Sequence, residues 1–322
     1  MRRGLLLLLL LIALSFCCSP KKSEKAENSG FSSFTFFTMD TVVEVQYRGE
    51  EPEVEGMVKR EFERLYAKYS PSLSTSATSR INRGAGAAME LDGESAYLLS
   101  QALLYSRLSE GRFDVTVKPL VDLWGFQGKS GDRPPPGRER VQETLKRVSY
   151  KRVLLAGRRL VLPEGMGIDL GGIAKGYAVD RARDLFRRAG VKDFLINAGG
   201  DLWAEGKNPG GEPWRVGVQN PRGEGILRVL SLSGKAVATS GDYQRFFLWE
   251  GRRYHHLLSP FTGYPFPFWT SMTVEAESCI KADALATAFS GVESGSVKAL
   301  LDRLPGVRLY ALRPDLSFED DL

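Results

Sequence analysis

The segment IDLGGIAKGYAVD at residues 168–180 places two adjacent glycines and a lysine at the predicted start of a helix. The free N–H groups and positive dipole end of a helix N-terminus favour an anion, and a glycine has no Cβ atom to keep a ligand from the backbone. Lys175, one turn further on, could reach the same anion. The alternative is a tight strand-to-helix turn with Lys175 in solvent, since the pattern is neither a dinucleotide-binding fingerprint nor a P-loop.

A second candidate for chemistry is the segment KADALATAF at residues 281–289. Asp283 and Thr287 are four residues apart, so on a helix their side chains share one face. A carboxylate and a hydroxyl are hard oxygen donors of the kind that Mg²⁺ prefers, and Mg²⁺ completes its shell with carbonyls, water or substrate phosphates. The alternative is an exposed Asp that complements the helix dipole and a Thr that bonds to its own turn.

The chain has two histidines, which are adjacent in YHHLLSPFTGYP at residues 254–265. Neighbouring residues of a strand point to opposite faces, so at most one of His255 and His256 faces a given site. The other is expected to be a core histidine bonded to a backbone carbonyl. Upstream, residues 239–241 are expected to form a turn with small groups and N–H donors. Two histidines and three cysteines are too few for a Cys/His metal site.

The elements that must position these residues are read from apolar periodicity and from glycine and proline signals. Helices are predicted at 52–69, 94–109, 138–148, 173–189, 279–291 and 294–302. Strands are predicted at 33–47, 193–197, 201–205, 214–219, 226–232, 243–249 and 307–313, and residues 168–170 are predicted to end a strand. Many strands follow one another without helices between them, which predicts an α+β class with a largely antiparallel sheet.

The first residues predict export. A basic start precedes an apolar run at residues 5–14, which is too short to span a bilayer and is typical of a secretory signal. We expect a lipoprotein signal peptide at 1–17, a polar tether at 18–32 and one domain at 33–318, with lipid on Cys17 or Cys18. The protein would then be an exported, membrane-anchored lipoprotein that faces the periplasm or the cell exterior.

Composition narrows the function classes further. The 322 residues are 43% hydrophobic and 26% charged, so the chain after the leader can form a sizeable core. The net charge of +5 is scattered over predicted solvated helix faces, which gives no support for nucleic-acid binding. Cys279 is left without a partner if Cys17 and Cys18 belong to the leader, so no disulfide framework is expected.

Eight blocks of the sequence, taken in order, resemble the ApbE family, the FAD:protein FMN transferases, over residues 34–312. They are FTMDTVVEVQ, RFDVTVKPLVDLWGF, IDLGGIAKGYAVDRA, FLINAGGDLWAEG, PWRVGVQNPR, ATSGDYQRFF, YHHLLSPFTGYP and KADALATA. The resemblance implies a T-fold-like α+β fold and an exported, Mg²⁺-dependent enzyme. Such an enzyme splits FAD at its pyrophosphate, transfers FMN through a phosphoester bond to a threonine hydroxyl of a partner protein, and releases AMP. It also implies flavin-bearing subunits of membrane redox pumps as acceptors.

The resemblance also implies roles for individual positions. The positions that match FAD contacts are Met39, Phe113, Asp114, Asp169, Lys175 and Leu258. The positions that match metal ligands are Gly172 through its main-chain carbonyl, Asp283, Thr287 and Ala286, where some members have an Asp and only a carbonyl could serve here. The predicted catalytic residues are Lys175, His256 and Asp283, and the base that takes the threonine proton is either His256 or Asp283.

The sequence departs from the family pattern at three positions. Ser259 replaces an Asp, Ser72 stands where an aromatic ring often stacks on FAD, and Ala77 stands where Glu is usual. Another aromatic residue, such as Trp124, is a candidate to replace the stacking ring.

Two alternative functions stay open. One is an FAD pyrophosphatase, in which water replaces the threonine, and the other is a flavin-binding lipoprotein without catalysis. The Asp283 and Thr287 pair argues against the second alternative, because passive binding needs no metal.

Overall fold

The computed structural model describes residues 30–126 and 133–320. The predicted signal peptide, both candidate lipid-bearing cysteines and most of the tether lie outside these ranges. The first strand begins at Phe31, within the range expected for the tether. In the described part of the chain, no helix has the length and apolarity needed to cross a membrane.

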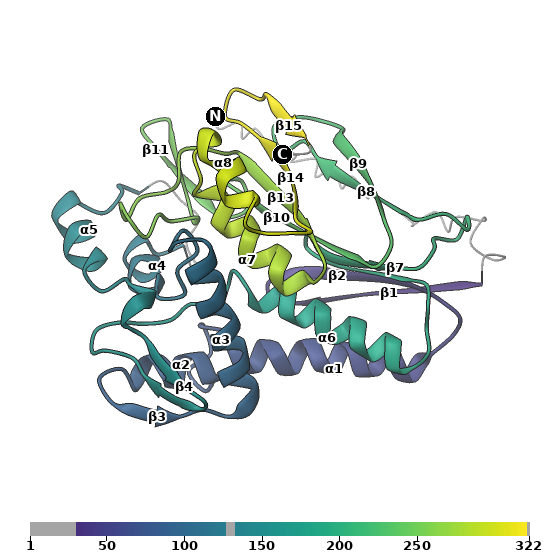
Figure 1. The fold of residues 1–322 in the computed structure, drawn as a ribbon, viewed down its shortest axis with the longest axis horizontal. Helices are drawn as coiled ribbons and strands as arrows, with labels where there is room; N and C mark the ends of the chain where they lie inside the picture. Colours follow the sequence, from purple (N-terminus) through teal and green to yellow (C-terminus); the bar gives the residue numbers. More distant parts are fainter. Residues whose placement is uncertain (1–29, 127–132, 321–322) are drawn as a thin grey trace, which may run out of the picture.

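An eight-stranded sheet forms the centre of the fold (Figure 1), and all its neighbouring strands are antiparallel. In spatial order its strands are β1 (Phe31–Thr38), β2 (Thr41–Arg48), β6 (Phe194–Ala198), β7 (Asp201–Glu205), β10 (Lys235–Gly241), β13 (Ser271–Ala276), β14 (Arg308–Leu312) and β15 (Phe318–Asp320). The predicted α+β class with a largely antiparallel sheet is therefore confirmed.

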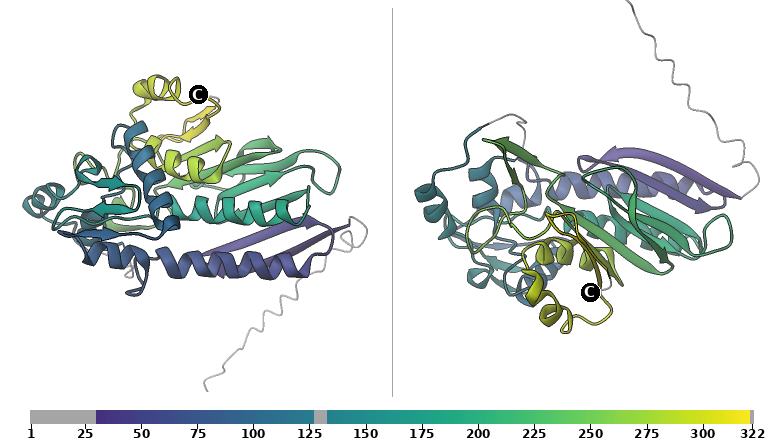
Figure 2. Two further views of the ribbon diagram at one scale, coloured as in Figure 1. Left: turned by 60° about the horizontal axis from the view of Figure 1, so that its bottom comes forward. Right: turned by 90° about the horizontal axis from the view of Figure 1, so that it is seen from above.

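Three long helices cover one face of this sheet and lie side by side (Figure 2): α1 (Pro52–Tyr69), α6 (Ala174–Arg188) and α7 (Cys279–Ser290). In α1, residues Val54, Val58, Phe62 and Leu65 are buried, and their spacing of three or four residues places them on one side of the helix. In α7, small residues dominate, so nearly the whole helix is buried between α6 and the sheet. The site residues of α7 therefore lie in the interior.

The other face of the sheet is covered by the hairpin of β8 (Trp214–Gln219) and β9 (Ile226–Leu232). Trp214, Val218, Leu230 and Leu232 of this hairpin share a second apolar cluster with Leu202 and other residues of the sheet. Both strands match their predicted ranges, because apolar residues alternate with polar ones along them.

The remaining elements gather mainly at one end of the sheet, on the left in Figure 1. The helices are α2 (Ala77–Arg83), α3 (Gly93–Leu108), α4 (Lys118–Trp124), α5 (Arg138–Leu145) and α8 (Ser294–Leu301), with a 3-10 turn at Tyr150–Arg152. The short strands are β3 (Ala88–Glu90), β4 (Leu154–Ala156), β5 (Arg159–Val161), β11 (Phe246–Trp249) and β12 (Arg252–His255). Sequence patterns did not predict the helices α2 and α4 or the strands β3, β4, β5, β10, β12 and β13.

Two predictions about the backbone near the site are wrong. Residues 168–170 form no strand, because their backbone bonds to groups outside any ladder: Ile168 bonds through both its N–H and its carbonyl to the Asn82 side chain, and the N–H of Asp169 donates to the carbonyl of Val115. Residues 239–241 form no turn but the end of β10, where they pair with β13.

Gly176 allows α6 and α7 to approach each other closely. A Cβ atom built on it would lie 2.3 Å from the carbonyl oxygen of Cys279 and 2.8 Å from the Cβ of Asp283. The nearest obstacle is backbone, so no rotamer change relieves it. The register between the two helices therefore depends on this glycine.

We expect Gly176→Ala to lower the free energy of unfolding by about 1–3 kcal/mol, because the added methyl group overpacks the contact. Gly56→Ala in α1 is the matched control, since its Cβ would meet only the flexible Arg60 side chain and alanine favours a helix. Denaturant unfolding measures both variants. Equal stability of Gly176→Ala and the wild type would contradict the proposed role of the contact.

Candidate active site at the junction of α6 and α7

The two segments that carry the candidate chemistry meet where the turn before α6 crosses α7. A Cβ atom on Gly172 would lie 3.0 Å from Thr287 Oγ1 and 3.2 Å from Phe113 Cε2. One turn further along α6, the N–H of Gly176 donates to Asp283 Oδ2 at 3.0 Å. Gly172 in the turn before α6 and Gly176 within α6 thus face Thr287 and Asp283, which are four residues apart on α7.

Asp283 is a buried carboxylate, with 5% of its surface exposed. Burial and the nearby Asp201 carboxylate raise the pKa of Asp283 to about 8, although Lys175 and the Gly176 N–H oppose the shift. The alternative of an exposed aspartate that complements the helix dipole is therefore wrong. Thr287 Oγ1 lies 3.3 Å from Ser240 Oγ, so the hydroxyl faces the end of β10.

Lys175 forms an ion pair with Asp201, the first residue of β7, with 2.8 Å between Nζ and Oδ2. The lysine side chain is 26% exposed and that of Asp201 only 2%. Burial lowers the pKa of Lys175, but the Asp201 and Asp283 carboxylates outweigh this effect and the net pKa is raised. The alternative of a solvated lysine is therefore wrong, and Asp201 is a site residue that sequence analysis missed.

The glycine turn uses most of its own amide donors. The N–H of Gly171 donates to Asp169 Oδ1 at 2.7 Å, and the N–H groups of Ile173 and Ala174 both donate to the carbonyl of Leu170. Burial raises the pKa of Asp169, and the Gly171 N–H opposes that shift. The turn therefore offers a ligand fewer free donors than the sequence suggests, and Asp169 holds the shape of the turn.

Phe113 and Asp114 form the neighbouring wall. Phe113 is buried and lies against the position of Gly172. The Asp114 carboxylate accepts hydrogen bonds from the Thr116 N–H at 2.8 Å, from the Thr116 hydroxyl at 2.6 Å and from the Tyr150 N–H at 2.9 Å. Asp114 therefore fixes the loop that carries Phe113.

Met39 lies in the two-residue turn between β1 and β2, where it and Asp40 have φ values of 49° and 59°. Such left-handed pairs fit a tight hairpin. Asp40 Oδ2 lies 3.3 Å from the guanidinium of Arg245, and the carbonyl of Arg245 accepts a hydrogen bond from the N–H of His256 at 3.0 Å. Arg245 thus joins the Met39 turn to the histidine loop.

The two histidines face different surroundings, as predicted from strand alternation. His255 is buried, and its Nε2 lies 2.9 Å from the carbonyl oxygen of Phe266, so it is the expected core histidine. His256 is half-buried, and burial together with the Arg245 guanidinium lowers its pKa. Its imidazole is therefore neutral near pH 7, and the lowered pKa makes it a weaker base than a free histidine.

The turn after His256 is held by Ser259, where the family pattern has an Asp. Its hydroxyl accepts hydrogen bonds from the N–H groups of Phe261 and Thr262, each at 3.2 Å, while buried Leu258 bridges to Pro265 across the turn. Serine and aspartate make the same kind of side-chain-to-backbone turn. This departure therefore preserves the local structure.

We expect Ser259→Ala to lower the free energy of unfolding by about 1 kcal/mol, because two turn N–H groups lose their acceptor. Ser259→Asp should match the wild type, and Ser33→Ala on the exposed face of β1 serves as a neutral control. Thermal unfolding compares the three variants. A Ser259→Ala protein as stable as the control would show that the hydroxyl does not hold the turn.

Two further predicted positions are less accessible than expected. Trp124 is 1% exposed, and its Nε1 donates to the carbonyl of Gly263 at 2.8 Å, so the idea that its ring replaces a missing flavin-stacking residue is wrong. Ala286 is fully buried within α7, and its carbonyl oxygen accepts a hydrogen bond from the Ser290 hydroxyl at 2.8 Å.

The donor set fits one hard divalent cation. Among the described residues, no group of three or more His, Cys, Asp or Glu side chains is arranged to hold a metal ion. The contact of α7 with α6 and the turn before it, which we call the seam, instead offers three donors. They are the Asp283 carboxylate, the Thr287 hydroxyl and the nearby backbone of Gly172. A buried carboxylate with a raised pKa is suited to a cation, because the cation replaces the proton that burial otherwise favours.

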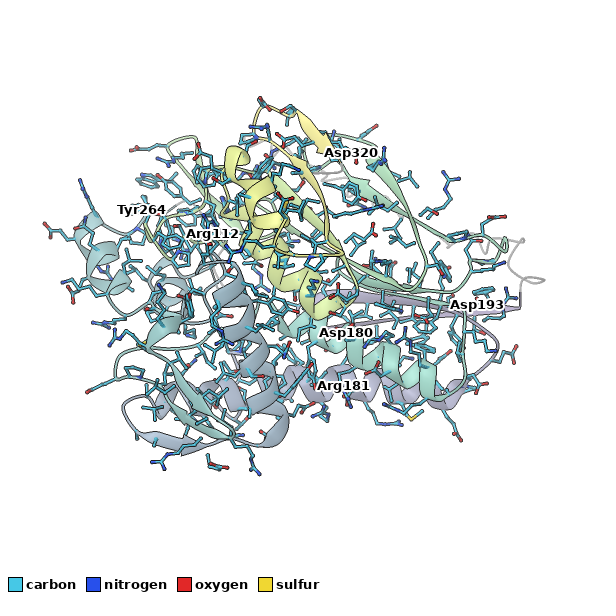
Figure 3. The ribbon with its side chains drawn as sticks, in the orientation of Figure 1. Arg112, Asp180, Arg181, Asp193, Tyr264 and Asp320 are labelled. Carbon is cyan, nitrogen blue, oxygen red and sulfur yellow. The ribbon has the colours of Figure 1, made fainter. Side chains whose placement is uncertain are left out.

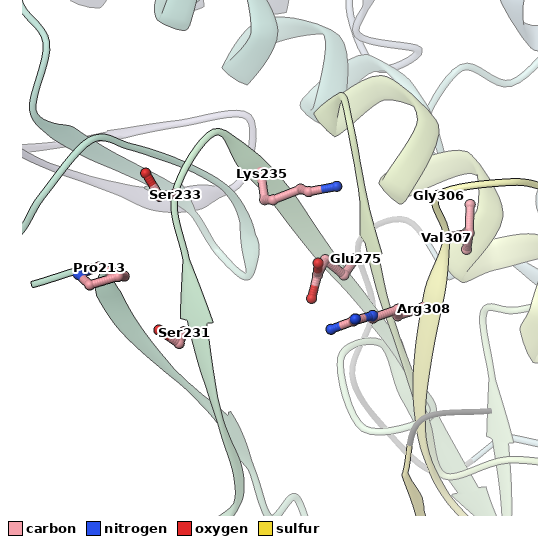
Figure 4. Close-up of a pocket in the computed structure, with 8 residues that line it drawn as sticks. All are labelled: Pro213, Ser231, Ser233, Lys235, Glu275, Gly306, Val307 and Arg308. Carbon is pink, nitrogen blue, oxygen red and sulfur yellow. The ribbon is translucent and has the colours of Figure 1, made fainter.

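The surface has one hollow near this seam and another far from it. One of about 450 Å³ is lined by Asn82, Lys118 and Gly167 among others, and so adjoins the start of the glycine run. The other, of about 610 Å³, is lined by Lys235, Glu275, Arg308 and other residues (Figure 4), and lies at the opposite end of β10 from the site. None of the residues that line either hollow is Gly172, Asp283 or Thr287.

Solved structures share this fold. An ApbE protein from Thermotoga maritima aligns with a TM-score of 0.84 and 34% identity, covering 90% of this chain and 97% of its own. The flavinyl transferase ApbE from Pseudomonas stutzeri aligns with a TM-score of 0.78 and 32% identity, covering 88% and 91%. The fold and its α6–α7 seam therefore define an α+β protein of the flavin transferase class.

Sequence comparison gives the family. The sequence model described as "ApbE family" matches residues 39–311. An FAD:protein FMN transferase from Vibrio cholerae is 30% identical over 334 aligned positions, covering 99% of this chain and 96% of its own, and one from Treponema pallidum is 33% identical over 266, covering 76% and 73%. The chain therefore belongs to the ApbE family and is an enzyme of that family.

Proposed function

We propose that this chain transfers FMN from FAD to a threonine hydroxyl of a partner protein in an Mg²⁺-dependent reaction that releases AMP. The observation that carries the proposal is the meeting of Asp283 and Thr287 with the Gly172 turn, inside a fold whose relatives are named FAD:protein FMN transferases. Passive flavin binding gives no reason to bury a carboxylate in this position.

We assign a separate role to each residue of the seam. Asp283, Thr287 and the Gly172 carbonyl would hold Mg²⁺, with Ala286 as a main-chain neighbour. A metal ion held by these residues would supply positive charge to offset that of the FAD pyrophosphate. Lys175, held by Asp201, contributes positive charge beside the same place, and Phe113 closes the wall. Catalysis of this kind rests on positioning and charge stabilisation, with little covalent work by the protein.

The transfer exchanges one phosphorus–oxygen bond for another. The threonine oxygen forms a bond to the FMN phosphorus, the bond from that phosphorus to the bridging oxygen breaks, and AMP leaves with that oxygen. The threonine proton goes to a base, for which neutral His256 and Asp283 are the two candidates. Met39, Asp114, Asp169 and Leu258 shape the surrounding FAD site through the turns that they hold.

The test uses the full-length protein in detergent with FAD, Mg²⁺ and a candidate acceptor, such as a flavin-bearing subunit of a membrane redox pump. Transfer predicts that the acceptor gains the mass of one FMN and becomes covalently fluorescent, and that EDTA prevents both. Production of AMP and free FMN without acceptor labelling would instead support the FAD pyrophosphatase. No turnover with any acceptor, together with FAD binding that is insensitive to EDTA, would favour the non-catalytic flavin-binding protein.

We also propose that the mature protein is a lipoprotein anchored on Cys17 or Cys18 and exposed to the periplasm or cell exterior. The support is the signal-like leader and the polar segment that follows it. The wild type should partition into the detergent phase, and the variant with both Cys17→Ala and Cys18→Ala into the aqueous phase. A mature protein that starts elsewhere and stays in the aqueous phase would contradict the proposal.

A further inference from the structure

Asp180, in the middle of α6, binds the first turn of α7. Its two carboxylate oxygens accept hydrogen bonds from the backbone N–H groups of Cys279 and Ile280, both at 2.9 Å. The carboxylate is buried, and Figure 3 labels Asp180 where α6 meets the start of α7. These are N–H groups that a helix cannot satisfy from within, so Asp180 caps α7 from a neighbouring helix.

The cap is the last of three contacts at four-residue intervals along the seam. The Gly172 position lies against Thr287, Gly176 binds Asp283, and Asp180 binds the turn at Cys279. The Asp283 carboxylate is one helical turn from the amide that Asp180 holds. A shift of the first turn of α7 along its axis would therefore move Asp283 away from the Gly176 N–H and the Gly172 backbone.

We propose that Asp180 is a positioning residue for the metal site, acting on Asp283 through the capped first turn of α7 and touching neither metal nor FAD. The inference rests on the proposed function for its meaning, because it assigns the metal to Asp283 and Thr287. The inference concerns the position of α7 along its axis relative to α6. Two backbone hydrogen bonds fix the start of α7, and the start of the helix in turn fixes the position of the metal-binding carboxylate of Asp283.

Arg183 supplies a way to separate this role from an ordinary ion pair. Its guanidinium pairs with Asp180 at 2.6 Å and with Asp184 at 2.9 Å. Asp184 lies one turn further along α6 and is more exposed, and the contacts of Asp180 to α7 are not made through Arg183. Asp184→Asn therefore perturbs the same arginine without removing the cap and serves as the matched control.

The test is Asp180→Asn in the full-length protein. An asparagine has one acceptor oxygen, so one N–H of α7 loses its partner and faces an NH₂ group instead. We expect the Mg²⁺ concentration for half-maximal FMN transfer to rise about tenfold or more, as for other residues that orient metal ligands, while the KM for FAD changes less than twofold. Affinity for Mn²⁺ without FAD, measured by electron paramagnetic resonance, should fall in parallel. Hydrogen exchange at Cys279 and Ile280 should become faster, and Asp184→Asn should change none of these quantities.

A merely structural role predicts a different pattern. It would lower kcat by reducing the folded fraction while leaving the Mg²⁺ and Mn²⁺ constants as in the wild type, and that result overturns the proposal. If Asp180→Asn does not fold, Asp180→Glu keeps both oxygens but moves them by one methylene, and an unchanged Mn²⁺ affinity in this variant would also overturn it. A wild type without Mg²⁺-dependent transfer would refute the proposed function instead, while the Mn²⁺ and exchange measurements would still decide the role of Asp180.

Discussion

Asp283→Asn should reduce Mg²⁺-dependent FMN transfer by about a hundredfold or more while leaving the fold intact. The loss is expected because charge stabilisation by a bound metal supplies several kcal/mol of the barrier reduction. The replacement is isosteric, and it removes a carboxylate that burial makes costly to ionise. Initial rates over a series of Mg²⁺ concentrations measure the effect.

The stability of the same variant gives an independent readout. Because the folded-state pKa of Asp283 is raised, its ionised form destabilises the metal-free fold above the ordinary pKa of an aspartate. Metal-free Asp283→Asn should therefore be at least as stable as the wild type at pH 8. Mg²⁺ should raise the unfolding temperature of the wild type but not of the variant, since a ligand stabilises only a fold that binds it. Asp302→Asn, a substitution outside the seam just after α8, is the control. An unchanged transfer rate and an unchanged Mg²⁺ shift would remove Asp283 from the metal set.

Lys175→Met should lower the free energy of unfolding by about 3–5 kcal/mol, because it leaves the buried Asp201 carboxylate without its ion-pair partner. FMN transfer should fall in the same variant, so a loss of activity alone says nothing about contact with FAD. Denaturant unfolding at pH 7 measures the stability.

A double variant separates the two effects. Lys175→Met combined with Asp201→Asn removes both charges and should recover most of the lost stability, because no uncompensated charge is left. FAD affinity in the recovered fold then reports what the lysine contributes to the ligand. Lys192→Met, at an exposed lysine, should leave stability unchanged. A loss below about 1 kcal/mol for Lys175→Met would mean that the lysine is not a structural counterion.

Local sequence patterns predicted those helices and strands that have one buried face and one exposed face. Helix α1 matches its predicted range because its apolar positions repeat at helical spacing, and β7, β8 and β9 match because their hairpins have clear limits. Strands β10 and β13 were missed because they are almost wholly buried and show no alternation. Residues 168–170 were misread because their backbone partner is the side chain of Asn82, far away in the sequence.

The candidate site divides in the same way. The spacing of Asp283 and Thr287 was enough to place them on one helix face, and the glycine run was correctly assigned to a helix start. Their meeting could not be predicted from local spacing, because it depends on the packing of two helices more than a hundred residues apart in sequence, and only the family resemblance implied it. The same holds for Asp201 beside Lys175 and for Asp180 beneath α7, which are tertiary contacts without a local signature.

The close contact at Gly176 limits which substitutions the fold tolerates at this position. At Gly176 the obstacle is the backbone of Cys279, which no second substitution can make smaller, whereas at Gly172 the obstacles are the side chains of Thr287 and Phe113. In a saturation library selected for stability, position 176 should therefore favour glycine over every other residue in any genetic background, with alanine the least costly replacement. Position 172 should accept alanine once smaller residues replace both Thr287 and Phe113.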